Sequence, residues 1–311
     1  MERRATAPPR RPPDLGLLLF LTPLIWGLTF PAGKVALERL SVPAFMAWSR
    51  TLGFLILLVS LPLFPRAGGW ADVRRALRPG IVLGAFLFLG YALQTAGLAR
   101  TTATNAGFIT GLYVVFTPVL ALIVLRQPTG PAAWAAVGIS VVGLALLSVE
   151  SLETLSLRPG DLLVLASAVA WAGHVVAVGR FTGRHSSAGL SLTQMAAASA
   201  FHLAGAFVVG TGVQPAEAAS VWGMLFLTGI LGSGVAFTIQ VFAQRRLTPA
   251  RAAIILAGES VFAGFFAAVW LGERLLVHQW IGAALTVAAM VLSEIGARRR
   301  PAEQLDPATA A

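Results

Sequence analysis

The feature that most constrains this chain is a succession of apolar runs, each about 20 residues long, that covers almost its whole length. A run of that length crosses a bilayer as an α-helix, which satisfies its own backbone hydrogen bonds. Only 12% of the 311 residues are charged, whereas soluble domains carry about 25%. The sequence therefore predicts an all-α polytopic membrane protein without room for a sizeable soluble domain.

Breaks at Gly, Pro and charged residues divide the apolar runs into ten predicted transmembrane helices. They lie at about 15–35, 42–64, 80–98, 104–125, 131–148, 161–180, 188–210, 220–243, 251–271 and 279–297. We expect a first five-helix repeat at 14–148 and a second at 161–297, joined by an extracytoplasmic linker at 149–160. The tails at 1–13 and 298–311 are expected to be cytoplasmic, and their Pro- and Ala-rich ends disordered.

The basic residues predict the orientation of the chain, because cytoplasmic loops are enriched in Lys and Arg. With ten spans and a cytoplasmic N-terminus, 17 basic residues lie on the inner side, Arg50 lies within a span, and five lie outside: Lys34, Arg39, Arg100, Arg158 and Arg274. The net charge of +10 is scattered in short groups between apolar runs and does not indicate a nucleic-acid partner. We expect both termini on the cytoplasmic side of the cytoplasmic (plasma) membrane.

The two halves of the chain match each other at an offset of 145 or 146 residues. Trp26 corresponds to Trp171 at 145, and further pairs match at 146: Tyr91/Phe237, Gln94/Gln240, Arg100/Arg246, Thr102/Thr248, Phe116/Phe262 and Trp134/Trp280. Five helices are an odd number, so the second half enters the membrane in the opposite sense. Inverted repeats of this kind recur in secondary transporters, where the solute site lies between the halves.

Several motifs carry a resemblance to a known family. They are Trp26-Gly27, Arg50, Asn105 to Pro118 (NAGFITGLYVVFTP), Gly160-Asp161 with Trp171-Ala172, Gly258 to Ala263 (GESVFA), Gly272-Glu273-Arg274 and Gln279 to Ala283 (QWIGA). Through them the chain resembles the ten-helix EamA-type branch of the drug/metabolite transporter superfamily over almost its whole length. The resemblance implies secondary transport of a small organic metabolite, and one similar subgroup exports amino acids.

Two positions depart from the pattern of that family or from the symmetry of the repeat. The family commonly has Glu-Pro in the ninth helix, whereas this chain has Glu259-Ser260, so the resemblance does not carry a proline kink to this position. The first repeat has Arg126-Gln127 where the second has Gly272-Glu273, so the acidic turn is present only once.

Aromatic and polar side chains at helical spacing predict a solute-binding surface. Trp26 and Thr29 share one helix face, and so do Trp171 and His174 at the equivalent place in the second repeat. Tryptophan normally prefers the headgroup level of a membrane, so Trp26 and Trp171 at mid-span favour a cavity in which a flat organic solute can stack. The alternative is helix packing by bulky side chains, and for His174 a satisfied hydrogen-bond donor.

Further polar residues on the third, fourth and eighth predicted helices complete the set of candidates for substrate binding. They are Tyr91, Gln94, Thr110, Tyr113 and Gln240. Each of them is equally consistent with hydrogen bonds between helices.

Arg50 and Glu259 are charged residues predicted to lie deep within the membrane, where such residues are expensive and usually functional. Burial favours the neutral form of a carboxyl group, so Glu259 is a candidate carrier of a coupling proton or a site for a substrate amine. The alternative is a structural ion pair between Arg50 and Glu259.

These observations favour a permease working by alternating access as an exporter, with no cofactor or metal and with the lipid bilayer as its surroundings. An intramembrane enzyme and a channel-like pore are the alternatives. Leu231-Gly232-Ser233-Gly234 is the only protease-like string, and it lacks an evident acid–base partner. The chain has no Cys, which excludes thiolate chemistry. We expect a monomer or a homodimer.

Overall fold

A computed structural model describes residues 18–63, 69–148 and 158–303, and these residues form helices and connecting turns without any strand. The helices are α2 (Leu21–Ala36), α3 (Val42–Ser60), η1 (Leu61–Leu63), α4 (Trp70–Leu98), α5 (Ala103–Gly111), α6 (Tyr113–Leu125), α7 (Pro131–Ser148), α8 (Pro159–Phe181), α9 (Ser187–Val208), α10 (Pro215–Ser220), α11 (Trp222–Leu225), the π-helix η2 (Phe226–Ala236), α12 (Phe237–Ala243), α13 (Pro249–Leu256), α14 (Glu259–Leu271) and α15 (Val277–Glu303). The predicted all-α fold is confirmed.

Six helical segments in the described part of the chain are long and apolar enough to cross a membrane. They are Val42–Leu63, Trp70–Leu98, Ala103–Leu125, Pro159–Phe181, Trp222–Ala243 and Pro249–Leu271. Pro131–Leu147 and Val277–Ser293 are shorter apolar helices. The helical segments coincide in position with the predicted spans, while the number of ten spans stays a prediction.

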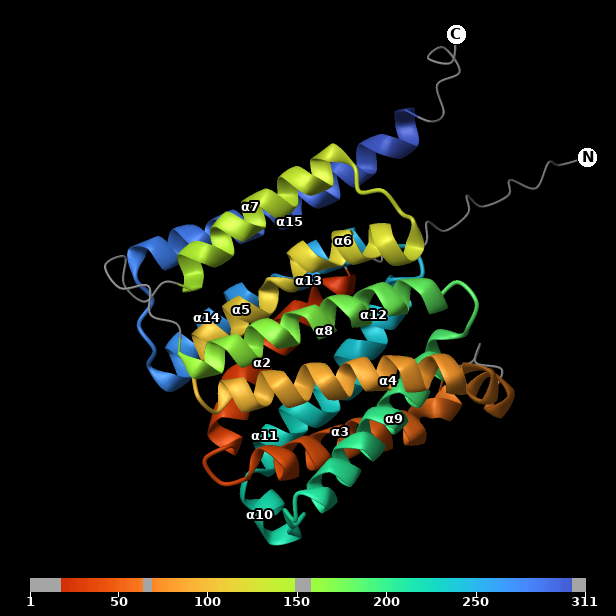
Figure 1. The fold of residues 1–311 in the computed structure, drawn as a ribbon, viewed down its shortest axis with the longest axis vertical. Helices are drawn as coiled ribbons and strands as arrows, with labels where there is room; N and C mark the ends of the chain where they lie inside the picture. Colours follow the sequence, from red (N-terminus) through yellow and green to blue (C-terminus); the bar gives the residue numbers. More distant parts are fainter. Residues whose placement is uncertain (1–17, 64–68, 149–157, 304–311) are drawn as a thin grey trace, which may run out of the picture.

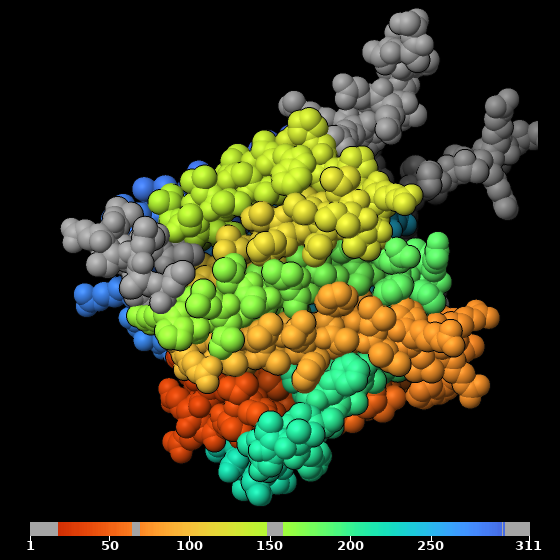
Figure 2. All heavy atoms as spheres, in the orientation of Figure 1, coloured from red at the N-terminus to blue at the C-terminus, as the bar shows by residue number. Residues whose placement is uncertain are grey.

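The helices pack side by side into a bundle (Figure 1). In this bundle α4 packs against α8 and α9, α3 against α9 and η2, and α14 against α2. Helices α7 and α15 pack on each other along one edge. Figure 2 shows the adjacent segments forming a continuous surface with little space between them.

Large apolar side chains are exposed on the outside of the bundle. Among the most exposed are Val59, Leu63, Phe207, Val208 and Val269. Exposed apolar surface on this scale is unfavourable in water and favourable against lipid chains. The interior holds the polar residues that the sequence predicts for a site, as described below.

Side-chain caps start several helices, and one pair of caps follows the repeat. The Oγ1 atoms of Thr102 and Thr248 accept hydrogen bonds from the backbone N–H groups of Asn105 and Arg251, at 3.0 and 3.4 Å. Each hydroxyl satisfies one of the N–H groups that a helix start leaves without a partner. The Thr102/Thr248 match in the sequence therefore marks equivalent helix starts.

The two halves also share a broken helix. In the first half, Leu112 separates α5 from α6; in the second half, Ala257 and Gly258 separate α13 from α14. Leu112 and Gly258 are 146 positions apart, as the repeat requires. The second break lies directly before Glu259, where the family commonly has Glu-Pro and this chain has Glu259-Ser260. The helix is therefore broken at this position without a proline.

Both broken helices end in the same turn. Arg126 and Gly272, again 146 positions apart, have left-handed backbone conformations with φ of 55° and 69°. In each case the following N–H group bonds a carbonyl in the last turn, Gln127 to Ala121 and Glu273 to Ala267, both at 3.3 Å. Glycine adopts this conformation without steric cost, whereas the Cβ atom of Arg126 makes the same conformation sterically unfavourable.

Two helices are longer than predicted. Helix α4 begins at Trp70 rather than near residue 80, and α15 continues to Glu303 rather than ending near 297. The added turns contain Arg and Ala, which favour helix but lower the local hydropathy, so a criterion based on apolar runs omits them. The tail predicted at 298–311 is therefore helical as far as Glu303, which corrects the expectation of disorder from Pro301 onward. The predicted tail at 1–13, the remainder of the C-terminal tail at 304–311 and most of the linker, 149–157, lie outside the described residues.

Candidate solute-binding site

One buried cavity lies where helices of both halves meet. Its lining comprises Trp26, Thr29, Phe30, Tyr91, Gln94, Thr110, Tyr113, Trp171, His174, Val175, Phe237, Gln240, Leu256 and Glu259. The nine residues that the sequence predicts for substrate binding are all in this set, together with Glu259. They come from α2, α4, α5, α6, α8, α12 and α14, so the fold gathers residues that are far apart in the chain.

The cavity is narrow. The volume that the centre of a water-sized molecule can occupy is about 30 Å³, whereas sites for drug-sized ligands usually measure about 300–1,000 Å³. An organic solute therefore needs the lining side chains or helices to move before it can enter.

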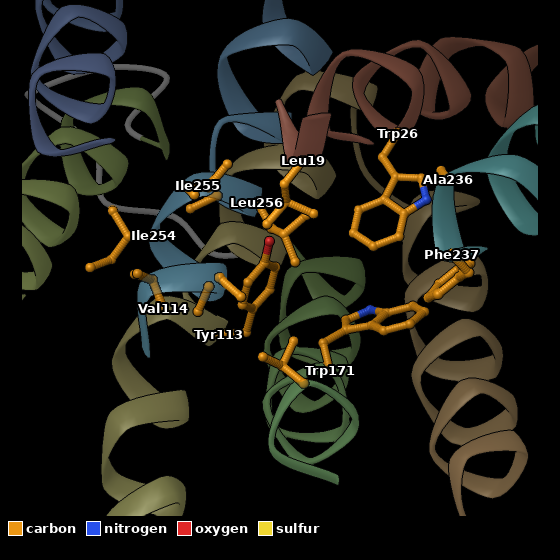
Figure 3. Packing of buried hydrophobic residues seen from close by; sticks show 14 of the residues in the cluster. Leu19, Trp26, Tyr113, Val114, Trp171, Ala236, Phe237, Ile254, Ile255 and Leu256 are labelled. Atoms are coloured by element: carbon orange, nitrogen blue, oxygen red, sulfur yellow. The ribbon is translucent and has the colours of Figure 1, made fainter. Parts of the chain in front are cut away.

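Aromatic rings form one wall of the cavity, and Figure 3 shows those of Trp26, Trp171, Phe237 and Tyr113 around a common space. The ring centroids of Trp26 and Phe237 are 4.7 Å apart. The ring of Trp171 is stacked on that of Phe237 with centroids 6.1 Å apart, and it lies at a right angle to the ring of Tyr91 with centroids 4.7 Å apart. These separations are in the range of favourable aromatic contacts, so the wall offers flat apolar faces to a solute.

Backbone features fix the two tryptophans. The indole N–H of Trp26 donates to the carbonyl oxygen of Gly232 at 2.9 Å, which anchors Trp26 to the π-helix η2. Trp171 lies across Gly90 of α4, where an added Cβ would come within 3.0 Å of its ring. Gly90 is therefore needed for the close approach of Trp171.

Hydrogen bonds orient the polar lining. Gln94 Nε2 donates to Thr110 Oγ1 at 2.8 Å, and His174 Nε2 pairs with Gln194 Oε1 at 2.9 Å. Gln240 Nε2 donates to Gln244 Oε1 at 2.9 Å. Gln94 and His174 thus take part in contacts between helices, the alternative that the sequence left open for Gln94, whereas the bond of Gln240 joins it to the C-cap of its own helix, α12.

Other polar atoms of the lining are buried without a hydrogen-bond partner among the described residues. They are Nε1 of Trp171, Nδ1 of His174 and Oε1 of Gln240. Buried polar atoms are usually satisfied, and each exception calls for a reason such as a ligand. Three such atoms on one cavity provide donors and acceptors for a solute.

Glu259 lies at the first turn of α14, directly after the helix break, and is 4% exposed. The hydroxyl of Tyr113, next to the equivalent break, faces its carboxyl group. Ser260 donates from Oγ to the carbonyl oxygen of Gly107 at 3.0 Å. The two helix breaks therefore bring Glu259 and Tyr113 together from opposite halves.

Arg50 lines a second cavity of about the same volume, 30 Å³, which shares Thr29, Phe30, Tyr91 and Gln94 with the first. Its guanidinium carbon lies 3.6 Å from the centre of the Tyr91 ring, and Nη2 donates to the carbonyl oxygen of Thr228 at 3.3 Å. Its Nε and Nη1 atoms have no hydrogen-bond partner in the described residues. The structure therefore does not join Arg50 and Glu259 in the ion pair that the sequence offered as an alternative.

Four lining residues were not predicted: Phe30, Phe237, Val175 and Leu256. Phe237 corresponds to Tyr91 in the repeat, and this match is a signal that could have identified it. The other three are apolar residues in an apolar chain, where composition and spacing do not distinguish lining from packing.

A wider hollow, about 490 Å³ by the same measure, lies between the loop after α6 and the start of α13. Arg126, Arg246 and Arg251 contribute to it, at helix ends that the sequence predicts to be cytoplasmic. Arg126 and Arg246 are exposed, so this hollow is part of the outer surface rather than a buried site.

Comparison with known proteins agrees with the fold and the repeat. The EamA-like transporter family matches the chain twice, at residues 15–149 and 158–294. An uncharacterized transporter of Archaeoglobus fulgidus is 33% identical over 279 residues, which cover 90% of this chain and 84% of that one. A second one from the same organism is 26% identical over 89% of this chain and 96% of its own length.

A shorter match and a solved structure complete the comparison. The uncharacterized transporter YyaM of Bacillus subtilis is 28% identical over 54% of this chain and 56% of its own. One crystal structure superposes with a TM-score of 0.74 at 18% identity, covering 91% of this chain and 98% of that chain. This last likeness concerns the fold alone.

The fold and the family matches define a multi-pass membrane transporter for a small molecule. The chain belongs to the EamA-like transporter family, and the resemblance found in its sequence is confirmed.

Proposed function

We propose that this protein is a secondary transporter that exports a small organic metabolite, an amino acid or another amphipathic compound, across the cytoplasmic membrane by alternating access. The observation that carries the proposal is the cavity between the halves. It combines an aromatic wall with three polar atoms that lack partners among the described residues. Such a lining suits a solute with a flat apolar part and a few polar groups.

The inverted repeat supports alternating access. Two halves with opposite orientation can exchange conformations around a central site, which then opens to either side. The equivalent helix breaks at Leu112 and Gly258 lie beside the cavity residues Tyr113 and Glu259. Bending at these breaks is the simplest motion that would widen the cavity from either side.

A coupling proton is the finer part of the proposal, and Glu259 is its candidate carrier. Glu259 lines the cavity and has no cationic partner at salt-bridge distance within the described ranges. A carboxyl group in this position can exchange a proton when the cavity opens to water.

The family resemblance supports export as the direction of transport, and the distribution of basic residues supports cytoplasmic termini. The protein is proposed to act as a monomer or a homodimer.

Flux measurements in proteoliposomes test this function. Purified protein is reconstituted, and uptake of radiolabelled amino acids and other amphipathic metabolites is measured with and without the same unlabelled solute inside. A carrier gives saturable uptake that internal solute accelerates. Uptake that rises linearly with concentration and does not respond to internal solute would support a channel-like pore and overturn the proposal.

A further inference from the structure

The guanidinium group of Arg50 is a buried cation that the protein itself leaves incompletely paired. Arg50 is 1% exposed. A buried charge is strongly unfavourable unless it is paired and hydrogen bonded. Its contacts in the described part of the chain are the ring and the hydroxyl of Tyr91 and one carbonyl oxygen, that of Thr228. Two of its nitrogens, Nε and Nη1, remain without an acceptor.

Among the described residues, none that interacts with Arg50 supplies a negative charge to complete the pairing. Tyr91 offers its ring and its hydroxyl, and His202 of α9 is near enough to interact with the guanidinium, but neither is a carboxylate. An arginine donates through a planar fork that matches the two oxygens of a carboxylate. The free positions on Arg50 therefore fit a carboxylate better than a neutral group.

The cavity beside Arg50 leads to the aromatic wall. It adjoins the cavity between the halves, and both include Thr29, Tyr91 and Gln94. The ring of Tyr91 contacts the guanidinium of Arg50 with its face and lies at a right angle to the ring of Trp171. A solute with its charged end at Arg50 would therefore place an attached flat group next to Trp171.

We propose that Arg50 binds the carboxylate of the transported solute, and that the solute carries an aromatic or other flat apolar group on a short linker. The proposal rests on the transport function proposed above and names its substrate class. It also explains why the chain keeps an arginine at a depth where an apolar residue of similar size would avoid the cost of burying a charge.

Binding of two matched probes to the purified full-length protein tests the proposal. The probes are 3-phenylpropionate and its primary amide, which have nearly the same size and differ in charge. Thermal stabilisation as a function of probe concentration gives each dissociation constant. We expect the carboxylate to bind at least about tenfold more tightly than the amide.

Variants of Arg50 locate the origin of the preference. In Arg50→Met, which keeps much of the stem and removes the charge, the amide should still bind and the preference for the carboxylate should disappear. Arg50→Lys should restore part of the preference. Arg39→Met removes an exposed charge elsewhere and should bind both probes as the wild type does.

The proposal would be overturned if the wild-type protein bound both probes equally tightly or did not bind the carboxylate. It would also be overturned if the preference for the carboxylate survived in Arg50→Met. The comparison on the wild type needs no variant and stays decisive if Arg50→Met does not fold. The proteoliposome assay tests the transport function separately from this binding assay. Saturable flux of a solute without a carboxylate would support the transport function even if the proposal for Arg50 failed.

Discussion

Trp171 is the residue that contributes most to the aromatic wall, since it contacts Tyr91, Phe237 and His174. We expect Trp171→Ala to raise the KM of transport about tenfold or more, because a large stacking surface is lost from the site. Trp134→Ala is the matched control, because Trp134 is 41% exposed on the outside of the bundle. Kinetics of uptake into proteoliposomes, at equal amounts of reconstituted protein, measure both. An unchanged KM in Trp171→Ala would show that the residue serves packing.

Glu259→Gln tests the coupling proton. The amide keeps the size of the side chain and cannot exchange a proton. If Glu259 carries the proton, uptake driven by a pH gradient should vanish, whereas exchange of labelled for unlabelled solute should continue at a rate near that of the wild type. Glu217→Gln, on the exposed helix α10, provides the control. Retained pH-driven uptake in Glu259→Gln would refute the role.

The residues of the site could be predicted because tryptophan, glutamine and histidine are unusual within apolar helices and their spacing follows helical faces. Their partners could not be predicted. The contact of Arg50 with Tyr91 and the bond from Trp26 to Gly232 join residues from distant helices, and their geometry depends on how the helices cross. Phe237 could be inferred only through its match with Tyr91.

At the scale of elements, the left-handed turn after α6 contains a strained position. Arg126 has φ of 55° where its counterpart is Gly272. Arg126→Gly should stabilise the protein by about 0.5–1 kcal/mol, since the steric cost that it removes exceeds the added freedom of the unfolded chain. Gly272→Ala should have the opposite effect. Thermal unfolding of the two purified variants measures the difference, and a loss of stability in Arg126→Gly would contradict this account.

The acidic turn that occurs only in the second half caps a helix of the first half. The carboxylate oxygens of Glu273 accept hydrogen bonds from the N–H groups of Ala103 and Thr104 at 3.0 and 3.1 Å, at the start of α5. A negative charge at a helix N-terminus is favourable, so Glu273→Gln should lower the unfolding free energy by about 1 kcal/mol. Gln127→Ala at the equivalent exposed turn should change it by less. Thermal unfolding of the two variants measures both changes, and an equal loss of stability in Glu273→Gln and Gln127→Ala would show that Glu273 does not act as a cap.

The type of most elements could be predicted, because long apolar runs and Thr or Ser caps are local signals. The helix breaks could not. Leu112 interrupts a run of strongly apolar residues, and no proline marks the break at Gly258. Neither break coincides with a local signal of the kind that residue type and spacing provide, so the sequence alone predicts continuous helices there.

The orientation of the whole molecule can be tested because the chain has no cysteine of its own. Thr211→Cys lies between α9 and α10 on the predicted outer side, and Gly183→Cys lies after α8 on the inner side. A membrane-impermeant thiol reagent on intact cells should label the first and reach the second only after permeabilisation. The reverse pattern would reject the predicted orientation.

The narrowness of the cavity has a consequence for any measurement of affinity. If the described conformation predominates at equilibrium, a solute binds only the fraction of molecules whose cavity is wider, and the apparent dissociation constant is the intrinsic one divided by that fraction. Modest affinity would then reflect the rarity of the open form rather than poor contacts. A substitution far from the cavity that favours the open form would tighten binding without touching the solute.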